Sequence, residues 1–346
     1  MIFYLMIFLL VMVWIFLEKK SLNRISFWTP IFMLSVFSGI RSHDVGSDSK
    51  NYTYNFVNNI NAENIEIVIN EEVGFSILNY FILIYTHNYF WLFFISSIIV
   101  VFCYLYFIKK YSVNYFLSVF CFLSLGLYTF HFNGLRQGLA MAISILALPY
   151  LIEKNFWKFL IVIIFASLFH KSALVLSIFY IIVNFKLRIE YKFLLVFLLS
   201  LSFSGIGIEY LAQNNARYET YTQLSEKSGG YITLAFYVLI GFFIYWASIK
   251  FFKNDYFFRK ASEFYICGLA FLIPVAMLGT NASGPQRLLF YFVGVLIIIL
   301  PNILVKLNNK FIYFFFLILG FIYFYLTTSI FANLNPYYMN QIFRII

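Results

Sequence analysis

Charged residues are scarce in this chain. Asp, Glu, Lys and Arg make up 11% of its 346 residues, whereas a soluble domain carries about 25%. So few charges cannot cover a soluble globule of this length, and 63% of the residues are apolar. The apolar residues form runs of about 14 to 22, long enough to cross a bilayer as helices. The sequence therefore predicts an all-α polytopic integral membrane protein.

Cysteine and several signature motifs are also rare or missing. Cys103, Cys121 and Cys267 all lie inside apolar runs, which indicates helix packing and not a disulfide framework. The sequence has no Walker motif, CxxC, HExxH or Asp-x-Asp pair, so nothing supports ATP hydrolysis, a zinc site or a metal-bound nucleotide sugar. Charges inside the runs are nearly absent, which argues against an ion-coupled transporter. We expect no metal and no cofactor.

Twelve apolar runs are predicted to span the membrane, within a single transmembrane domain over residues 1–346. A thirteenth run, 73–86, is short and follows two acidic residues, so we expect it to be re-entrant or interfacial. The first run lacks a basic start and a cleavage site, and we expect a retained span. The predicted spans are 2–17, 26–40, 89–108, 113–132, 136–152, 155–169, 172–185, 191–208, 231–251, 261–279, 287–305 and 311–331.

The net charge of +10 is explained by topology and not by nucleic-acid binding, because most cations flank apolar runs. With 73–86 left out, one set of alternate loops holds 16 of the 24 cations and five of the 14 acids. The positive-inside rule assigns that set to the cytoplasm. Both termini, the polar loops 41–72 and 209–230, and all four histidines then lie on the external, periplasmic side. We expect the chemistry on that face.

The segment after the second predicted span carries a histidine and two carboxylates behind Arg41. Gly46 allows a turn there, and Asp48 is a candidate proton acceptor. An ordinary polar loop with a helix N-cap at Asp48 or Ser49 is the alternative interpretation.

A second cluster begins at Asn133, which is expected to cap a helix that runs inward from the external face. Arg136 then falls in the first helical turn, where a cation opposes the helix dipole. An anion held by Arg136 and free backbone N–H groups would resolve this conflict. The alternative is an arginine that reaches for lipid phosphates.

Two further external helix starts carry charged residues. Pro285 stands where an N1 proline would be, and it places Arg287 in a first turn like that of Arg136. Two such arginines suggest an anion with two charged groups, such as a pyrophosphate. His170 begins another helix and is a candidate general base, with a capping or interfacial role as the alternative.

The loop 209–230 mixes charges with tyrosines, among them Arg217, Tyr218 and Glu219. Aromatic rings stack on the apolar faces of sugars and carboxylates bind hydroxyls, so the loop is a candidate glycan surface. Tyrosines also gather at the interface of any membrane protein, which is the alternative.

Four segments, taken in order, resemble the EpsG/Wzy-type polysaccharide polymerases of bacterial O-antigen and capsule gene clusters. They are 41–52, with Val-Gly-Ser-Asp and Asn-Tyr; 72–79, with Glu-Val-Gly-Phe; 133–140, with Asn-Gly-Leu-Arg-Gln; and 169–173, with Phe-His-Lys-Ser-Ala. The Arg-Gln-x-x-Ala and His-x-Ser-Ala elements are the more specific. The second half of the chain matches only in hydropathy, a periplasmic loop and the late Arg287.

The resemblance implies a membrane glycosyltransferase in the bacterial inner (plasma) membrane. A glycan on undecaprenyl pyrophosphate would pass to the non-reducing-end hydroxyl of a lipid-linked repeat unit on the periplasmic side, without a metal. His170 or Asp48 would be the base. Pyrophosphate would be held by Arg136, Arg287, Arg41 and Arg217, and the glycan by Gln137, Tyr52, Tyr218 and Glu219.

Three other functions are alternatives to a polymerase. An O-antigen ligase would use nearly the same chemistry. A flippase or transporter of lipid-linked sugars would show two related halves and charges in a central cavity. An acyltransferase would need acyl-CoA from the cytoplasmic side, where no histidine lies. The expected partners are the undecaprenyl pyrophosphate-linked oligosaccharide and the bilayer, with a chain-length regulator and a flippase as candidates and no nucleic acid.

Overall fold

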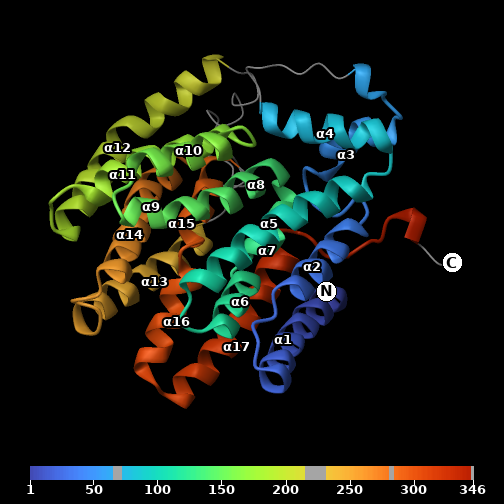
Figure 1. Cartoon of the computed structure of the whole chain (residues 1–346). Helices are drawn as coiled ribbons and strands as arrows, with labels where there is room; N and C mark the ends of the chain where they lie inside the picture. Colours follow the sequence, from blue (N-terminus) through green and yellow to red (C-terminus); the bar gives the residue numbers. More distant parts are fainter. Residues whose placement is uncertain (65–71, 215–230, 280–283, 344–346) are drawn as a thin grey trace. The chain divides into compact units, whose positions relative to one another are not determined.

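The computed structural model describes residues 1–64, 72–214, 231–279 and 284–343. Helices make up nearly all the regular structure of these residues (Figure 1), and among them there is no β-strand, only an isolated bridge between Arg41 and Met339. The prediction of an all-α protein is confirmed.

Each predicted span is helical, but the predicted count of about twelve is not confirmed. Within the described part of the chain, eight helices are long and apolar enough to cross a membrane, or nine if the bent pair Pro285–Val293 and Leu296–Leu307 forms one span. Crossing about 30 Å takes about 20 residues. Three of the expected spans form apolar helices of fewer than 18 residues: Trp28–Gly39, Phe156–Ser167 and Lys171–Asn184. The run 73–86 forms the short helix α4 (Val73–Tyr85).

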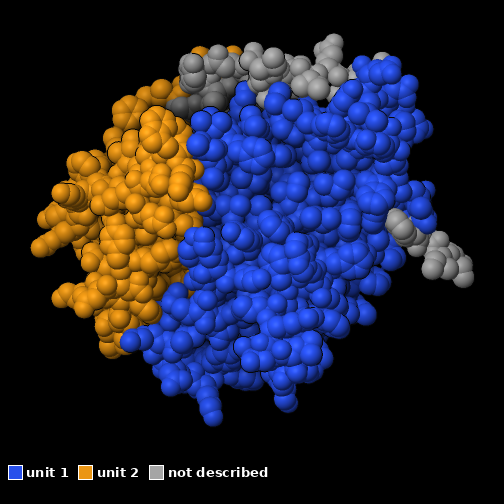
Figure 2. Space-filling model, viewed as in Figure 1, with its two compact units in different colours: residues 1–147, 161–174, 300–346 blue, residues 148–160, 175–299 orange. Residues whose placement is uncertain are grey.

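The chain divides into two compact units (Figure 2), and the single transmembrane domain stays a prediction. The first unit comprises residues 1–147, 161–174 and 300–346. Its helices include α1 (Ile2–Leu22), α2 (Trp28–Gly39), α3 (Ser49–Val57), α4, α5 (Phe90–Tyr111), α6 (Tyr115–Ser124), α7 (Leu127–Asn133), α8 (Leu135–Ser144) and α17 (Lys310–Leu326), with the end of α10 (Phe156–Ser167).

Aromatic side chains and asparagine caps organise this first unit. The rings of Phe8, Phe120 and Phe321 lie 4.8–5.6 Å apart in pairs and join α1, α6 and α17. Asn114 accepts a hydrogen bond from a backbone N–H at the start of α6, and Asn309 does so for α17. Side-chain caps of this kind satisfy helix N–H groups that have no partner within the helix.

A segment that follows α17, residues 332–340, fastens several parts of the first unit, and we call it the C-terminal strap. Its backbone pairs with the residues after α2, since Ser42 N donates to Tyr338 O (2.7 Å) and Asn340 N to Ile40 O (2.8 Å). Tyr4 of α1 donates its hydroxyl to Leu334 O at 2.9 Å. The strap therefore holds α1 and the loop after α2 together.

The second unit, residues 148–160 and 175–299, is built around α14 (Tyr256–Met277). Its other elements are α9 (Leu148–Ile152), the start of α10, α11 (Leu176–Asn184), α12 (Ile189–Asn214), α13 (Tyr231–Lys250), η5 (Pro285–Leu288), α15 (Leu289–Val293) and the start of α16 (Leu296–Leu307).

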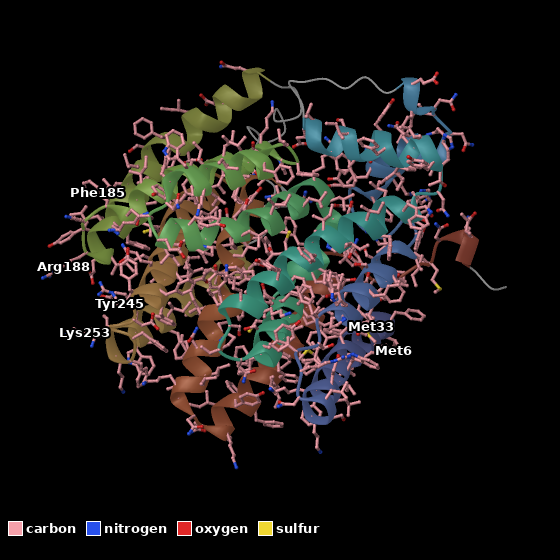
Figure 3. The ribbon with its side chains drawn as sticks, viewed as in Figure 1. Met6, Met33, Phe185, Arg188, Tyr245 and Lys253 are labelled. Carbon is pink, nitrogen blue, oxygen red and sulfur yellow. The ribbon has the colours of Figure 1, made fainter. Side chains whose placement is uncertain are left out.

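Cations of two loops predicted to be cytoplasmic meet at one end of this second unit. Lys192 and Lys260 both donate to Glu263 (2.7 and 2.9 Å). Both also donate to the carbonyl of Val183 in the last turn of α11 (2.7 and 2.6 Å), where the helix dipole favours cations. Figure 3 shows Arg188 and Lys253 at the same end of the unit. The two loops therefore lie on one side of the unit, and their cytoplasmic location stays a prediction.

Candidate functional site

One buried carboxylate joins two of the residues that the sequence singled out. In the first unit, Arg136 Nη1 donates to Glu72 Oε2 at 2.7 Å, and His170 Nδ1 lies 2.8 Å from Glu72 Oε1. The Glu72 side chain is only 5% exposed, against 28% for Arg136 and 17% for His170. We call these three residues the Glu–Arg–His cluster. Its carboxylate is buried, and its arginine and histidine are partly exposed.

Backbone contact between α4 and the end of α10 brings Glu72 to His170. Glu72 is the N-cap residue of α4, and two residues later Gly74 N donates to Leu168 O at 2.8 Å. A Cβ added at Gly74 would lie 3.0 Å from both the Cβ and the carbonyl oxygen of Leu168. Because glycine has no side chain, the two backbones approach closely at this point, two residues from Glu72 and two from His170.

Arg136 occupies the first turn of α8, as predicted, but Asn133 does not cap that helix. Helix α7 ends at Asn133, and Gly134 is the N-cap residue of α8 without a side-chain cap. The Asn133 side chain instead accepts from Ser47 N (2.9 Å) and donates to Ala332 O (2.8 Å). The predicted capping role is wrong, because this amide links the loop after α2 to the strap.

The anion expected beside Arg136 is, at least in part, supplied by the protein. The Glu72 carboxylate compensates the unfavourable position of a cation at a helix N-terminus. The guanidinium also lies over the rings of Phe75 (4.8 Å to the centroid) and Tyr52 (5.6 Å). Its Nε is buried and has no hydrogen-bond partner within the described part of the chain. One nitrogen of Arg136 is therefore paired with Glu72, while 28% of the side chain remains exposed.

The electrostatics of the cluster keep Glu72 ionised. Burial raises the pKa of this carboxyl, but hydrogen bonds and charges from His170 and Arg136 outweigh that effect and lower its pKa to about 2. A carboxylate beside Nδ1 of a histidine orients the ring and favours the tautomer with a proton on Nδ1. Because Nδ1 of His170 lies beside the Glu72 carboxylate, Nε2 is the other ring nitrogen, away from that contact.

Arg41 was predicted as a pyrophosphate ligand, yet it lies in the core with 0% of its surface exposed. Its Nη1 donates to Val45 O, Ser49 Oγ and Phe132 O (2.8–3.1 Å), and the guanidinium carbon lies 3.8 Å from the ring centroid of Phe93. Burial lowers the pKa of Arg41 to about 10, so it stays charged at neutral pH. A lipid pyrophosphate cannot reach Arg41 in this structure.

The turn predicted at Gly46 is confirmed. Its φ is +103°, and a Cβ there would lie 2.1 Å from Phe132 O, so only glycine fits. Asp48 follows as the N-cap residue of α3 without a side-chain cap, and it accepts from Ser47 Oγ at 3.1 Å. The loop that carries Asp48 thus packs against the end of α7, close in sequence to the start of α8.

The other predicted residues divide between the units. Gln137 is buried in α8. Arg287 belongs to the second unit, half-buried in η5, where Pro285 holds a first-turn position as expected. Arg217, Tyr218 and Glu219 lie outside the described residues. The first unit therefore brings together Arg136, His170 and Tyr52, and the cluster includes a residue that had not been assigned a role.

Comparison with protein families gives a match to the EpsG family over residues 24–340, which covers nearly the whole chain and all three residues of the cluster. The chain belongs to the EpsG family. With its long apolar helices, this EpsG-family member is a multi-pass membrane protein of the polysaccharide polymerase type. Searches of curated proteins and of solved structures found no match.

Glu72 is the residue of this EpsG protein that sequence reasoning missed. It was noted only as part of the Glu-Val-Gly-Phe segment. The available signal was the arginine in the first turn of α8, which called for an anion, but nothing local points to a partner 64 residues away. Within the described residues, no group of three or more His, Cys, Asp or Glu side chains could hold a metal ion.

Proposed function

We propose that this protein is a polysaccharide polymerase that acts on the periplasmic face of the bacterial inner membrane. It transfers a growing glycan from undecaprenyl pyrophosphate to a hydroxyl of a lipid-linked repeat unit. The observation that carries the proposal is the Glu–Arg–His cluster, in which an oriented histidine adjoins a partly exposed arginine. A base and a cation side by side are what glycosyl transfer from a pyrophosphate requires.

In the proposed step, His170 Nε2 removes the proton of the acceptor hydroxyl. The acceptor oxygen forms a bond to the anomeric carbon of the donor, and the bond from that carbon to the pyrophosphate oxygen breaks. The electron pair of the broken bond leaves with undecaprenyl pyrophosphate. The proton stays on the imidazole, where the Glu72 carboxylate, 2.8 Å from Nδ1, stabilises the positive charge.

The charge of the cluster supports this assignment. In the proposed step His170 begins without its extra proton, so the charges of Arg136 and Glu72 cancel before the proton is transferred. Once His170 is protonated, the cluster becomes cationic at the moment when the leaving group gains negative charge. Interactions that strengthen during the reaction lower the barrier, whereas equal binding throughout does not. Arg136 is thus the proposed pyrophosphate ligand, with Arg287 and Arg217 as further candidates and no metal in the step.

Tyr52 is a proposed sugar contact beside the cluster, since its ring lies under the Arg136 guanidinium. Gln137, Tyr218 and Glu219 remain candidate glycan residues. Asp48 is the second candidate base, because its loop is fixed against the end of α7 through Asn133.

The deciding experiment is the surface-glycan length profile of cells that lack the gene and carry either the wild-type protein or a variant. We expect His170→Asn to reduce the ladder to single repeats while the protein still accumulates. His87→Asn is the matched control, since His87 contacts Ile60 O and lies outside the cluster; it should keep the ladder.

Other profiles would refute the proposal. Loss of all surface glycan, with lipid-linked polymer accumulating in the envelope, would mean a ligase. Single units held on the cytoplasmic leaflet would mean a flippase. A normal ladder with His170→Asn would remove this histidine from the reaction.

A further inference from the structure

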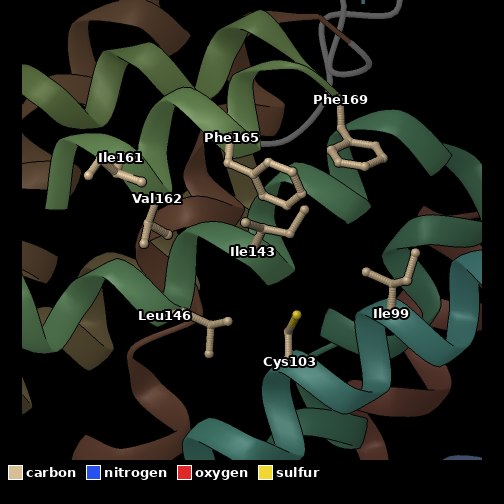
Figure 4. Close-up of a pocket in the computed structure, with 8 residues that line it drawn as sticks. All are labelled: Ile99, Cys103, Ile143, Leu146, Ile161, Val162, Phe165 and Phe169. Atoms are coloured by element: carbon tan, nitrogen blue, oxygen red, sulfur yellow. The ribbon is translucent and has the colours of Figure 1, made fainter. Parts of the chain in front are cut away.

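An apolar groove of about 410 Å³ lies in the first unit between α5, α8 and α10 (Figure 4). Ile99 and Cys103 of α5 line one side, and Ile161 and Phe165 of α10 line the other. Ile143 of α8 lies between them. Apart from the Cys103 thiol, every lining side chain is a hydrocarbon, so the groove offers nothing to a sugar or a phosphate.

The groove is deep on one side and open on the other. Cys103, Ile143 and Phe169 are at most 8% exposed and form its floor, whereas Ile161 and Phe165 are 65% and 52% exposed and form its rim. An exposed hydrocarbon rim on a membrane protein faces acyl chains and not water. A lipid could therefore enter the groove sideways from the bilayer.

The groove adjoins the Glu–Arg–His cluster along two helices. Phe169, on its floor, directly precedes His170. On α8, Ile143 follows Arg136 by seven residues, which is about 10.5 Å along the axis and nearly two full turns. Arg136 and Ile143 thus share one face of α8. The cluster thus lies at the first turn of α8 and the groove at its last turn, on one face of the helix.

We infer that this groove binds the isoprenoid tail of the lipid-linked substrate next to its pyrophosphate; the inference rests on the proposed function. The partly exposed Arg136 guanidinium suits a pyrophosphate, and the hydrocarbon groove suits the chain attached to it. A carbon group of the chain is about the size of a water molecule, which takes up about 30 Å³. The groove of about 410 Å³ therefore holds roughly two to three isoprene units of five carbons each. The rest of the tail lies in the bilayer.

The first test is photolabelling of the full chain in phosphatidylglycerol/phosphatidylethanolamine nanodiscs. The probe is a polyprenyl pyrophosphate with a diazirine on its second isoprene unit. We expect the label on peptides that contain Ile99–Cys103 and Ile161–Phe169, with undecaprenyl pyrophosphate competing. Labelling elsewhere, or equal competition by added phospholipid, would overturn the inference, the latter by assigning the groove to bilayer lipid.

Substitutions provide an independent second test. Ile143→Trp fills the floor of the groove. We expect it to raise the apparent Kd of undecaprenyl pyrophosphate by about tenfold, because about two methylene groups of the tail would no longer be buried. Ile161→Trp narrows the rim without disturbing the core and should act in the same direction. Ile164→Trp is the control, because Ile164 is 48% exposed on the same helix but does not line the groove. Unchanged affinity in both groove variants would overturn the inference.

A third measurement separates this inference from the proposed function. Binding of inorganic pyrophosphate should be unaffected by Ile143→Trp and weakened by Arg136→Ala. If the label maps to the groove but purified protein does not lengthen lipid-linked glycan, the proposed function fails and the groove remains a polyprenyl site. If the protein lengthens glycan while the groove variants keep wild-type affinity, the groove assignment alone fails.

Discussion

Glu72→Gln is the substitution that tests the Glu–Arg–His cluster most directly. It keeps the size of the side chain but removes the charge that faces Arg136 at 2.7 Å and His170 at 2.8 Å. A glutamine cannot stabilise a protonated His170, so general-base catalysis should weaken. Such catalysis contributes about 10²- to 10⁴-fold, and we expect polymerisation to slow by about 100-fold or more.

The assay is elongation of a lipid-linked repeat unit by purified protein, followed on a gel. Glu72→Gln should leave Arg136 half-buried without its carboxylate partner, and removal of one member of a buried pair costs about 3–5 kcal/mol. Since Arg136 is 28% exposed, the cost should fall below that range. A thermal melt in detergent therefore accompanies the rate measurement, so that lost activity is not mistaken for lost fold.

A double variant distinguishes a role through His170 from a general structural role. If Glu72 acts by orienting His170, Glu72→Gln combined with His170→Asn should be no slower than His170→Asn alone, because residues that act as a unit are not additive. If the two substitutions acted independently, their fold-reductions in rate would multiply. Full activity of Glu72→Gln, or multiplied effects, would refute the reasoning.

Four further predictions follow from single contacts. Arg136→Ala should abolish long glycan chains, while an immunoblot shows that the protein still accumulates. Arg136→Lys should also be impaired, because a lysine lacks the two-pronged guanidinium group that binds a phosphate. A normal ladder with Arg136→Lys would show that only the positive charge at this position matters. Gly74→Ala should push α4 from α10, at a cost of about 1–3 kcal/mol, and slow elongation; wild-type kinetics would show that the close contact does not set the position of Glu72. Glu263→Gln should lower the thermal midpoint more than Lys192→Met, since it leaves the ammonium groups of the buried Lys192 and the partly buried Lys260 without their acid; the reverse order would contradict this account. The pKa of Glu72 is about 2, below the ordinary glutamate value of 4.5, and this contributes stability that is fully present above pH 4.5 and lost as the pH falls toward 2. Thermal melts across that window should show a loss of stability that Glu72→Gln lacks.

Hydropathy alone located the helices well, because a run of apolar residues in a membrane has few alternatives to a helix. It did not settle how many cross, since α2 and α10 are helical but only 12 residues long each. Crossing depends on depth and tilt, which the packing of neighbouring helices determines. The short run 73–86 was predicted not to cross, and it forms a 13-residue helix.

The site was partly predictable for a different reason. Arg136 and His170 stood out because each sits at a helix start where its charge or acid–base chemistry is unusual. Glu72 did not stand out, because its significance lies in partners distant in sequence. Arg41 shows the converse: its sequence neighbours suggest an exposed polar loop, yet the aromatic rings that bury it, Phe93 and Phe132, come from elsewhere in the chain.

The C-terminal strap has a consequence for the order in which the protein matures. The strap is synthesised after α17, yet it pairs with the backbone beyond α2 and accepts from the Asn133 side chain just before α8. The loop that carries Asp48 and the start of the helix that carries Arg136 are therefore fastened only after α17 has left the ribosome. A nascent chain lacks this fastening until then, and stalled or truncated chains never obtain it. Assembly of the region around Asp48 and Arg136 therefore waits until the strap has been synthesised.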